Sequence, residues 1–525
     1  MEVPVFKHTV EKIEAALKDE KESLQTIAAL IKYDPGLYFS FIHKLAVSGF
    51  KGEVTTMSQA ASLLGSNAIS QEIPLHERLD DDENTIILWC GAVLAGEAAI
   101  LINEQSPVTE PEEAFFAAIL PQIGMLLLLE QRPEYRLLLP LLLQMHIEDR
   151  IFLEDRLFQK NHISVLQEMQ LPFMYRDVAD LIREEHLPSD DEEGEPGPAR
   201  LSTAHISSQL YNLAMAAEYV AQSVLFPALV MAQENLKQLN KRYFNISESK
   251  IEELLSNVID RFETVSCDFG VEEQSSGLLA AAGQVHEPEV KFLTTFAPLL
   301  RVLNELFAKS PQERNILIWG EIGVGKRLLA YALHYHPENP RRTGPFLSLH
   351  CDTSERETLE EDIFGSGGGF WGTDQHKGAL DIAAGGTILL KNIDKMPLPL
   401  QDRLADIIAR VKYYRSRNIP DIKGDVLFIL TSRKDLNEEV NEGRFSKMLM
   451  RAIDPTVIYI PPLRERRDDI GMVAEGIIKK YHLPLTDMTS HLSLQEFYDT
   501  YAFKNNLSDL KRLLFYAAAK KLLKS

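Results

Sequence analysis

A glycine-rich segment in the C-terminal half has the residue types and spacing of a phosphate-binding loop. The apolar run Ile316–Trp319 precedes GEIGVGKR (Gly320–Arg327), and the helical pattern LLAYALHY follows. Strand, glycine-rich loop and helix are the context that a P-loop requires. Its glycines let backbone N–H groups point at phosphate, and the lysine reaches the β- and γ-phosphate oxygens. A tight structural turn would not explain the lysine. The residues predicted to contact a nucleotide here are Gly320, Glu321, Gly323, Val324, Gly325, Lys326 and Arg327.

The elements around this loop read as an α/β domain. Short β-rich runs alternate with helical patterns, and they are Ile316–Trp319, Pro345–His350, Thr387–Leu390, Asp425–Leu430 and Thr456–Ile460. Strands separated by helices predict a parallel sheet that binds ligands at the carboxyl ends of its strands. From Arg466 to Ser525 only helical spacing remains, which predicts a small helical lid.

The N-terminal half has a different pattern. Apolar residues recur at helical spacing from Val10 to about His186 and again from Ala204 to about Val265, which predicts an all-α domain. The acidic run Ser189–Pro198 reads as an exposed loop. A small, polar break at Ser266–Glu289 marks a domain boundary. We therefore expect a helical domain at 1–265, a linker at 266–290, an α/β domain at 291–465 and a lid at 466–525.

Charge separates the two halves. The chain has 525 residues and a net charge of −22, and residues 291–525 carry 34 Lys+Arg against 30 Asp+Glu. Residues 1–290 therefore hold all of the excess acid, a balance of −26. An acidic surface repels phosphate backbones, which disfavours nucleic-acid binding by this half. It could attract a basic protein partner or serve only solubility.

Cysteine usage and hydropathy predict a cytoplasmic protein. Cys90, Cys267 and Cys351 are far apart and lack ligand spacing, which argues against disulfides and zinc. The N-terminus has no signal-peptide pattern. The stretch Leu137–Met145 is taken as the most apolar, and it is shorter than the ~20 residues of a membrane span. We therefore expect no membrane contact.

The N-terminal half resembles the HDOD family, a non-catalytic relative of HD phosphohydrolases. The segments that carry the resemblance are Lys32–Phe50, Ser58–Gly65, Leu88-Trp89, Pro111–Phe116, Ile119–Gly124, Asn161-His162 and Leu171-Pro172. HD phosphohydrolases bind metal through a His-Asp pair at the position of Pro121-Gln122. Pro has no ligand atom and Gln is a weak ligand, so no two-metal site is expected. For His162 and His186 a packing or surface role is favoured. The resemblance implies a role in protein interaction and signalling, although a plain helical scaffold remains an alternative.

The C-terminal half resembles the sigma-54-interacting AAA+ domain of bacterial enhancer-binding proteins. The segments KGALDIAAGGTILLKNIDKMPLPLQDRL, NEGRFSKML and YIPPLRERRDDI carry this resemblance, which runs from about Phe292 to Ser525. It implies an AAA+ α/β domain with a helical lid.

Residues that the family needs for ATP hydrolysis are missing. The metal-holding Asp and the water-polarising Glu fall at Lys391 and Asn392, and neither replacement can do that chemistry. No γ-phosphate-sensing Asn occurs within Thr431–Arg433. Ser446 replaces the first trans-acting arginine, and Arg451 is out of register with the second. Ser508 replaces the arginine of the second sensor. Together these losses predict a pseudo-ATPase without catalytic residues.

The intact loop still favours binding of ATP or ADP, and no metal is predicted. A sharper hypothesis is that Lys391 and Arg327 neutralise the triphosphate without Mg²⁺. The alternative is that Lys391 points to solvent and the pocket is empty, and the sequence does not decide between them.

Two aromatic residues occupy the loop that contacts the polymerase in this family. The family motif Gly-Ala-Phe-Thr-Gly-Ala matches Gly368–Thr373, in which Phe370 persists and Trp371 replaces the sigma-54-contacting Thr. Either this loop contacts a protein partner or Trp371 folds back into the domain. The sequence ends at Ser525 within the lid, without the family's helix-turn-helix. The basic clusters Arg464–Arg467 and Lys511–Lys524 read as a structural segment and a solvated face, so direct DNA binding is not expected.

The sequence as a whole predicts a bacterial regulatory protein that acts through protein–protein interaction, with an AAA+ domain that binds nucleotide without hydrolysing it. The alternative is a weakly active ATPase that modulates sigma-54-dependent transcription by co-assembling with active AAA+ subunits. A metal-dependent phosphohydrolase in the N-terminal half is disfavoured. Partner, signal and oligomeric state stay open, and oligomerisation is compatible with either hypothesis.

Overall fold

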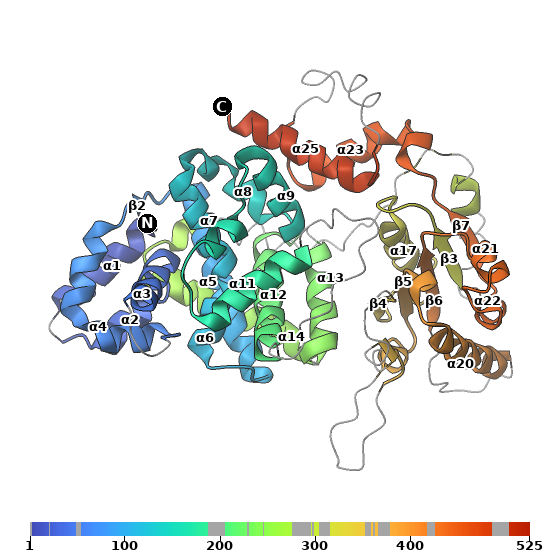
Figure 1. The fold of residues 1–525 in the computed structure, drawn as a ribbon, viewed down its shortest axis with the longest axis horizontal. Helices are drawn as coiled ribbons and strands as arrows, with labels where there is room; N and C mark the ends of the chain where they lie inside the picture. The colour runs from blue at the N-terminus through green and yellow to red at the C-terminus, as the bar shows by residue number, and fades with distance from the viewer. Residues whose placement is uncertain are drawn as a thin grey trace, which may run out of the picture. The chain divides into compact units, whose positions relative to one another are not determined.

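The structure is a computed structural model with two compact units (Figure 1), residues 1–288 with 515–525 and residues 289–514. The residues that it describes are 3–19, 21–48, 54–186, 205–227, 230–244, 246–275, 294, 296, 299–303, 315–351, 359–360, 363–365, 378–416, 426–485 and 503–524.

The first unit is helical, as predicted. Its helices are α1 (Lys7–Lys18), α2 (Leu24–Ile31), α3 (Pro35–Val47), α4 (Met57–Glu72), α5 (Glu83–Gln105), α6 (Pro111–Ala118), α7 (Leu120–Gln131), α8 (Leu139–Leu143), α9 (Ile147–Phe158), α10 (His162–Gln167), α11 (Phe173–His186), α12 (His205–Leu225), α13 (Val230–Leu239) and α14 (Glu248–Asp268). The sequence did not predict the short parallel pair β1 (Val5–Phe6) and β2 (Arg78–Leu79). The helical fold continues into the segment assigned to the linker, where Phe269 and Val271 are buried.

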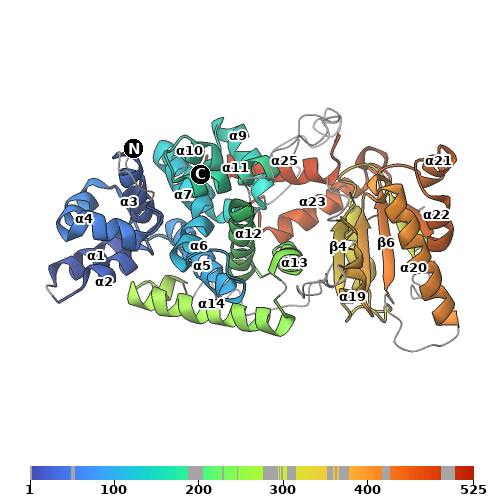
Figure 2. The ribbon, with the colours of Figure 1, turned by 60° about the horizontal axis from the view of Figure 1, so that its bottom comes forward.

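Helix α5 forms the centre of this unit and packs against α6, α12 and α14 (Figure 2). The expectation that Leu137–Met145 is the most apolar stretch was wrong. Helix α5 is longer, and it is apolar enough to cross a membrane. Its apolar window is 94% buried inside the unit, which is typical of a core helix. Two contacts fix the position of α5. Asp82 caps its N-terminus, and the Trp89 indole donates to the backbone oxygen of Tyr33 at 2.9 Å.

The second unit contains the predicted parallel sheet. Among the described residues it has five strands in the order β4-β5-β6-β3-β7, which are β3 (Ile316–Trp319), β4 (Phe346–His350), β5 (Thr387–Lys391), β6 (Leu427–Ser432) and β7 (Thr456–Tyr459). Each predicted strand is confirmed, with ends shifted by at most two residues. The strands are apolar because helices cover the sheet, and Leu317, Ile388, Leu390, Phe428 and Leu430 belong to one core cluster.

The helices of the second unit follow the strands in alternation. Among the described residues they are α17 (Lys326–His334), α19 (Ala379–Ile382), α20 (Leu398–Ser416), α21 (Leu436–Asn441), α22 (Lys447–Ile453), α23 (Asp469–Lys480) and the first part of α25 (Leu507–Leu522), whose residues from Phe515 on belong to the first unit. The strands are parallel, so the loops that follow β3, β5 and β6 lie at one edge of the sheet. The Gly320 N–H donates to the Ser432 oxygen at 3.3 Å, and the Asn392 N–H donates to Thr431 Oγ1 at 3.3 Å. These bonds join the three loops on which the predicted site depends.

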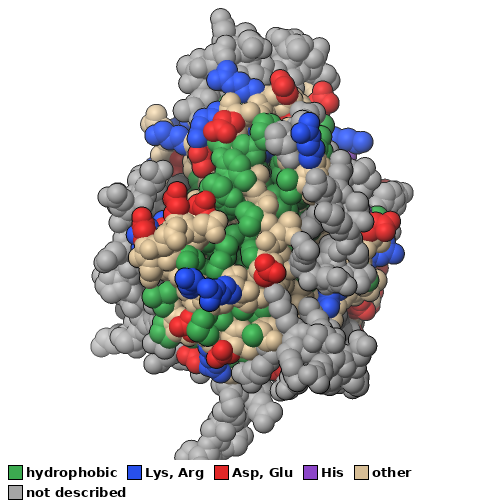
Figure 3. All heavy atoms as spheres, turned by 90° about the vertical axis from the view of Figure 1, so that its right-hand side faces the viewer, with side chains coloured by type: hydrophobic (Ala, Val, Ile, Leu, Met, Phe, Trp, Pro, Cys, Tyr) green, Lys and Arg blue, Asp and Glu red, His purple; other side chains and the backbone are tan. Residues whose placement is uncertain are grey.

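Apolar side chains are exposed on one side of the second unit. Met448 on α22 and Val457 and Tyr459 on β7 are between 41% and 53% exposed, and the Tyr459 ring lies 4.4 Å from that of Trp319. Figure 3 views the side on which α22 and β7 lie in Figure 1, and it shows apolar side chains gathered in a band with charged side chains beside it. Grouped exposed apolar side chains are typical of contact surfaces.

Candidate functional site

The predicted phosphate-binding loop has the backbone conformation that its glycines suggest. Gly320, Gly323 and Gly325 all have positive φ, at 150°, 72° and 100°. Gly325 lies in the left-handed region directly before α17, so the loop turns sharply into the helix N-terminus. Val324 is fully buried and anchors the middle of the loop. The conformation therefore depends on glycine at these positions.

Lys326, the first residue of α17, lies inside the curl of the loop. Its ammonium donates to the backbone oxygens of Gly320 and Glu321, at 2.6 and 2.7 Å. Burial, and after it the charge of Arg433, lower the pKa of Lys326 to about 8, while Asp394 and Glu321 act in the opposite direction. The lysine is therefore held at the loop by partners that a phosphate could replace.

Residues of the lid region hold the outer side of this loop. The Arg464 guanidinium forms a two-point contact with the Glu321 carboxylate, and it lowers the pKa of Glu321. Asn506 donates to the backbone oxygen of Ile322 at 2.8 Å, and the Leu507 N–H donates to that of Gly323 at 3.0 Å. Glu321 is thus a structural partner of Arg464 in this structure.

Arg466 binds the backbone of the phosphate-binding loop. Its guanidinium is buried and donates to the backbone oxygen of Val324 at 2.7 Å, and it pairs with Asp469 at 3.3 Å. The predicted structural role of the segment Arg464–Arg467 agrees with these contacts.

Replacement of Gly323 by alanine is expected to push the lid away from the loop. A Cβ there would lie 2.0 Å from the backbone oxygen of Asn505, whereas at Gly443, with a similar φ of 73°, it would meet no atom within 4 Å. Both substitutions incur the left-handed strain of ~1–2 kcal/mol, and only Gly323→Ala adds an overpacking cost of ~1–3 kcal/mol. Denaturation of the two variants measures the difference. Equal losses of stability would contradict the close contact.

The other two predicted cation positions, Arg327 and Lys391, have contacts of their own. The Arg327 guanidinium follows its own helix, with Nη2 3.2 Å from the Tyr331 hydroxyl and the cation 5.5 Å from the ring centre. Lys391 is the half-buried last residue of β5, and its backbone oxygen accepts from the Cys351 N–H at 2.9 Å. Lys391 therefore ends a strand at the edge of the sheet that carries the P-loop, whereas Arg327 is directed along α17.

The remaining catalytic positions have structural contacts. Asn392 adopts a left-handed conformation at φ 54°. Ser446 is the N-cap of α22, accepts from the Leu449 N–H at 3.2 Å and donates to Asp402. Arg451 is exposed in the last turn of α22, and Ser508 lies beside Gly323. Asn392, Ser446 and Ser508 thus differ in type from the residues that the resemblance implies for hydrolysis, whereas Arg451 is an arginine out of the expected register.

The sequence patterns did not indicate that Asp394 and Arg433 belong to the site. Both act electrostatically on Lys326, and they follow β5 and β6 by only a few residues. A search for charged residues just after each strand, rather than at family positions alone, would have found them. Phe370 and Trp371, the predicted partner contact, lie outside the described residues.

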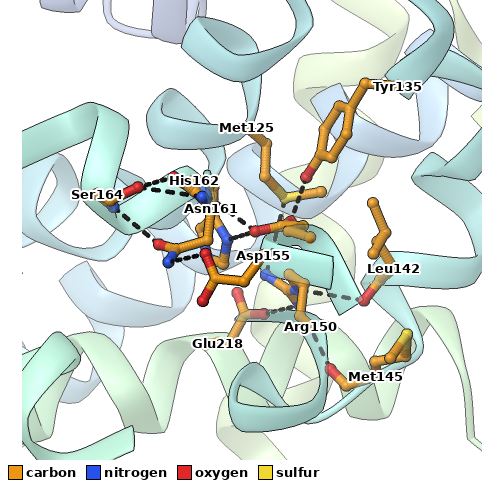
Figure 4. Close-up of polar contacts among 11 residues, drawn as sticks. Met125, Tyr135, Leu142, Met145, Arg150, Asp155, Asn161, His162, Ser164 and Glu218 are labelled. Atoms are coloured by element: carbon orange, nitrogen blue, oxygen red, sulfur yellow. Dashed lines mark hydrogen bonds and ion pairs between the residues drawn. The ribbon is translucent and has the colours of Figure 1, made fainter. Parts of the chain in front are cut away.

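In the first unit, the place of the missing His-Asp pair is filled by a buried polar network. Gln122 donates to the Glu218 carboxylate at 2.7 Å, and the fully buried Arg150 guanidinium binds Glu218 at 3.0 Å. Arg150 also donates to the backbone oxygen of Leu142 at 3.1 Å (Figure 4). A protein cation therefore neutralises the carboxylate, and within the described residues no cluster suited to a metal is found.

His162 belongs to a second buried group next to this network. Its Nδ1 lies 2.6 Å from the Glu154 carboxylate, which also accepts from the Tyr135 hydroxyl at 2.6 Å. Both His162 and Glu154 are fully buried. The packing role expected for His162 agrees with these contacts. The side chain of His186 lies outside the described residues.

Comparison with known proteins assigns both halves. Residues 3–169 match the model of the HDOD domain, and residues 294–459 match the model of the sigma-54 interaction domain. The DNA-binding transcriptional regulator NtrC of Proteus hauseri is 35% identical over 187 residues, which are 35% of this chain and 39% of that protein. The Nif-specific regulatory protein of Azospirillum brasilense is 34% identical over 185 residues, covering 35% and 29%.

The chain thus spans about a third of the length of these curated relatives. Among solved structures, NtrX from Brucella abortus in complex with ADP has a TM-score of 0.37 at 22% identity, over 50% of this chain and 58% of that one. Together with the parallel sheet, the glycine-rich loop and the helical N-terminal unit, the family matches identify the two parts. The chain carries an HDOD domain at residues 3–169 and, at residues 294–459, a sigma-54 interaction domain of the AAA+ fold.

Proposed function

We propose that this chain is a regulatory protein whose AAA+ domain binds ATP or ADP without hydrolysing it. The observation that carries the proposal is the contrast within one site. The loop Gly320–Lys326 keeps a phosphate-binding conformation, while Lys391 and Asn392 stand where the reaction needs a metal ligand and a base. NtrX, a structural neighbour, has been solved with ADP and with ATP, which supports nucleotide as the ligand.

We further propose that the protein acts through contacts with other proteins in sigma-54-dependent transcription. The sigma-54 interaction domain and the regulators among its relatives support the pathway. The first unit, whose interior holds the Arg150–Glu218 network, and the apolar band on the second unit support binding rather than catalysis. The proposed setting is the bacterial cytoplasm, without direct DNA binding by this chain. Its acidic half and the Phe370-Trp371 loop are the proposed partner contacts.

Steady-state phosphate release by the full chain tests the absence of turnover. We expect the rate with saturating ATP to equal that of Lys326→Ala, because Asn392 cannot activate water. A rate that Lys326→Ala abolishes would instead support the alternative, a weakly active ATPase that co-assembles with active AAA+ subunits. Binding must be measured in the same samples, so that an inactive preparation is not mistaken for a pseudo-ATPase.

The low pKa of Lys326 makes binding of ATP depend on pH. With a pKa of about 8, the lysine loses its proton as the pH rises above 8, whereas the charged phosphates favour the protonated form. ATP affinity should therefore fall by up to about tenfold per pH unit above 8, with uptake of a proton on binding. Lys326→Arg should remove this dependence, since arginine stays charged. Calorimetry at pH 8.5 in buffers of different ionisation enthalpy measures the proton uptake, and its absence would contradict the prediction.

A further inference from the structure

One carboxylate oxygen of Asp394, at the edge of the proposed nucleotide site, has no hydrogen-bond partner among the described residues. The residue lies in the 3₁₀ turn Ile393–Lys395, directly after β5 and Asn392. This oxygen, Oδ1, is buried. A buried oxygen of an ionised group without a partner is unfavourable. The structure therefore leaves a ligand atom available at this turn.

The position of the turn relates this oxygen to the phosphate-binding loop. The Asn392 N–H contacts Thr431 at the end of β6, and Ser432 in turn accepts from the Gly320 N–H. Hydrogen bonds thus connect the turn to the end of β6, and the end of β6 to the start of the phosphate-binding loop. The negative charge of Asp394 also acts directly on Lys326, against the effect of Arg433. Asp394 therefore belongs to the same charged cluster as the lysine predicted to contact phosphate.

We infer that Asp394 is a ligand for the divalent cation of a bound magnesium nucleotide. This inference rests on the proposed nucleotide binding. Mg²⁺ is held in proteins by one or two carboxylates together with substrate phosphates and waters, so a single aspartate suffices. The residue at the family's metal position, Lys391, is a cation and cannot serve. A carboxylate three residues further along supplies the oxygen from the same end of β5.

A competing role for Asp394 is to neutralise Lys326 alone. The two roles predict opposite changes in ATP affinity, measured with Mg²⁺ present, when the charge of Asp394 is removed. A metal ligand strengthens ATP binding only when Mg²⁺ is present. A neutralising carboxylate weakens ATP binding whether or not the metal is present, because it repels the phosphates.

Calorimetric titration of the full chain with ATP, in MgCl₂ and in EDTA, separates the two roles. We expect the wild-type chain to bind ATP at least about tenfold more tightly with Mg²⁺ than with EDTA, the effect of one charged contact. Asp394→Asn, which keeps the shape of the side chain, should remove this difference without weakening binding in EDTA. Glu438→Gln, at an exposed carboxylate on α21, should leave the difference unchanged. Unfolding of the variants without nucleotide verifies that they are folded.

The outcomes are distinguishable. If Asp394→Asn keeps the Mg²⁺ dependence, or raises ATP affinity equally in both conditions, the inference is wrong. If the wild-type chain binds ATP equally well in both, the inference is also wrong, and neutralisation by Lys391 and Arg327 is favoured. If the wild-type chain binds no ATP in either, the proposed function itself fails. Electron paramagnetic resonance of Mn²⁺ added with ADP gives a second readout, in which the bound signal should be lost only in Asp394→Asn.

Discussion

Replacement of Lys326 by alanine is expected to lower the affinity of the chain for ATP by about 10- to 100-fold, the value of one or two hydrogen bonds to a charged group. The ammonium is already held inside the loop by the oxygens of Gly320 and Glu321, so little ordering is needed when phosphate replaces them. Isothermal titration with ATP and with ADP measures the change.

Lys395→Ala provides the matched control for this substitution. Lys395 is an exposed lysine next to Asp394, so its removal changes the net charge by the same amount without touching the loop. Its ATP affinity should stay within about twofold of the wild-type value, because exposed charges contribute little. Equal affinities of Lys326→Ala and the wild-type chain would mean that nucleotide, if bound, is not bound at this loop.

Replacement of Glu218 by leucine is expected to destabilise the first unit by ~3–5 kcal/mol, because it leaves the Arg150 guanidinium buried without its countercharge. Arg150 is fully buried and Glu218 nearly so, and their contact is 3.0 Å. The double variant Arg150→Met/Glu218→Leu should recover most of this loss, since apolar residues of similar volume can replace a buried ion pair.

Fluorescence of Trp89 can report this unfolding separately from that of the AAA+ domain. The chain has three tryptophans, so Trp319→Phe and Trp371→Phe leave the buried Trp89 as the single reporter of the first unit. Lys160→Met, which breaks the exposed Lys160–Glu168 pair at 2.8 Å, is the control and should cost less than ~1 kcal/mol. A single Glu218→Leu variant as stable as this control would show that the buried pair contributes nothing.

Much of the C-terminal fold was predictable because its signals are local. The apolar runs of β3 and β5 are bounded by glycine or polar residues, so their ends were found to within a residue. The loop Gly320–Lys326 was equally recognisable because its spacing is dictated by the backbone. The pairing of Arg464 with Glu321 was not predictable, since 143 residues separate them and only the folded chain brings them together.

The N-terminal half shows the same limit. The loss of the His-Asp pair at Pro121-Gln122 was visible in the sequence. The buried network that occupies this place was not predictable from the sequence. Arg150 and Glu218 come from α9 and α12, and helical spacing alone does not tell which polar residue of a helix faces inward. The helical spacing of α5 was recognised, but its apolar length was not, because small residues distributed all round a helix give no clear apolar face.

The contacts at Asn392 and Ser446 have an evolutionary consequence. Asn392 has φ 54° and ψ 48°, a conformation that asparagine tolerates better than glutamate, and Ser446 caps α22 through the Leu449 N–H. Restoring a glutamate at 392 would add backbone strain of ~1 kcal/mol, and restoring an arginine at 446 would remove a helix cap worth ~1 kcal/mol. Under the proposed loss of hydrolysis neither change alone supplies all the missing groups, so each would lower stability without a gain in activity. The local fold therefore favours the present residues at both positions, independently of any effect on catalysis.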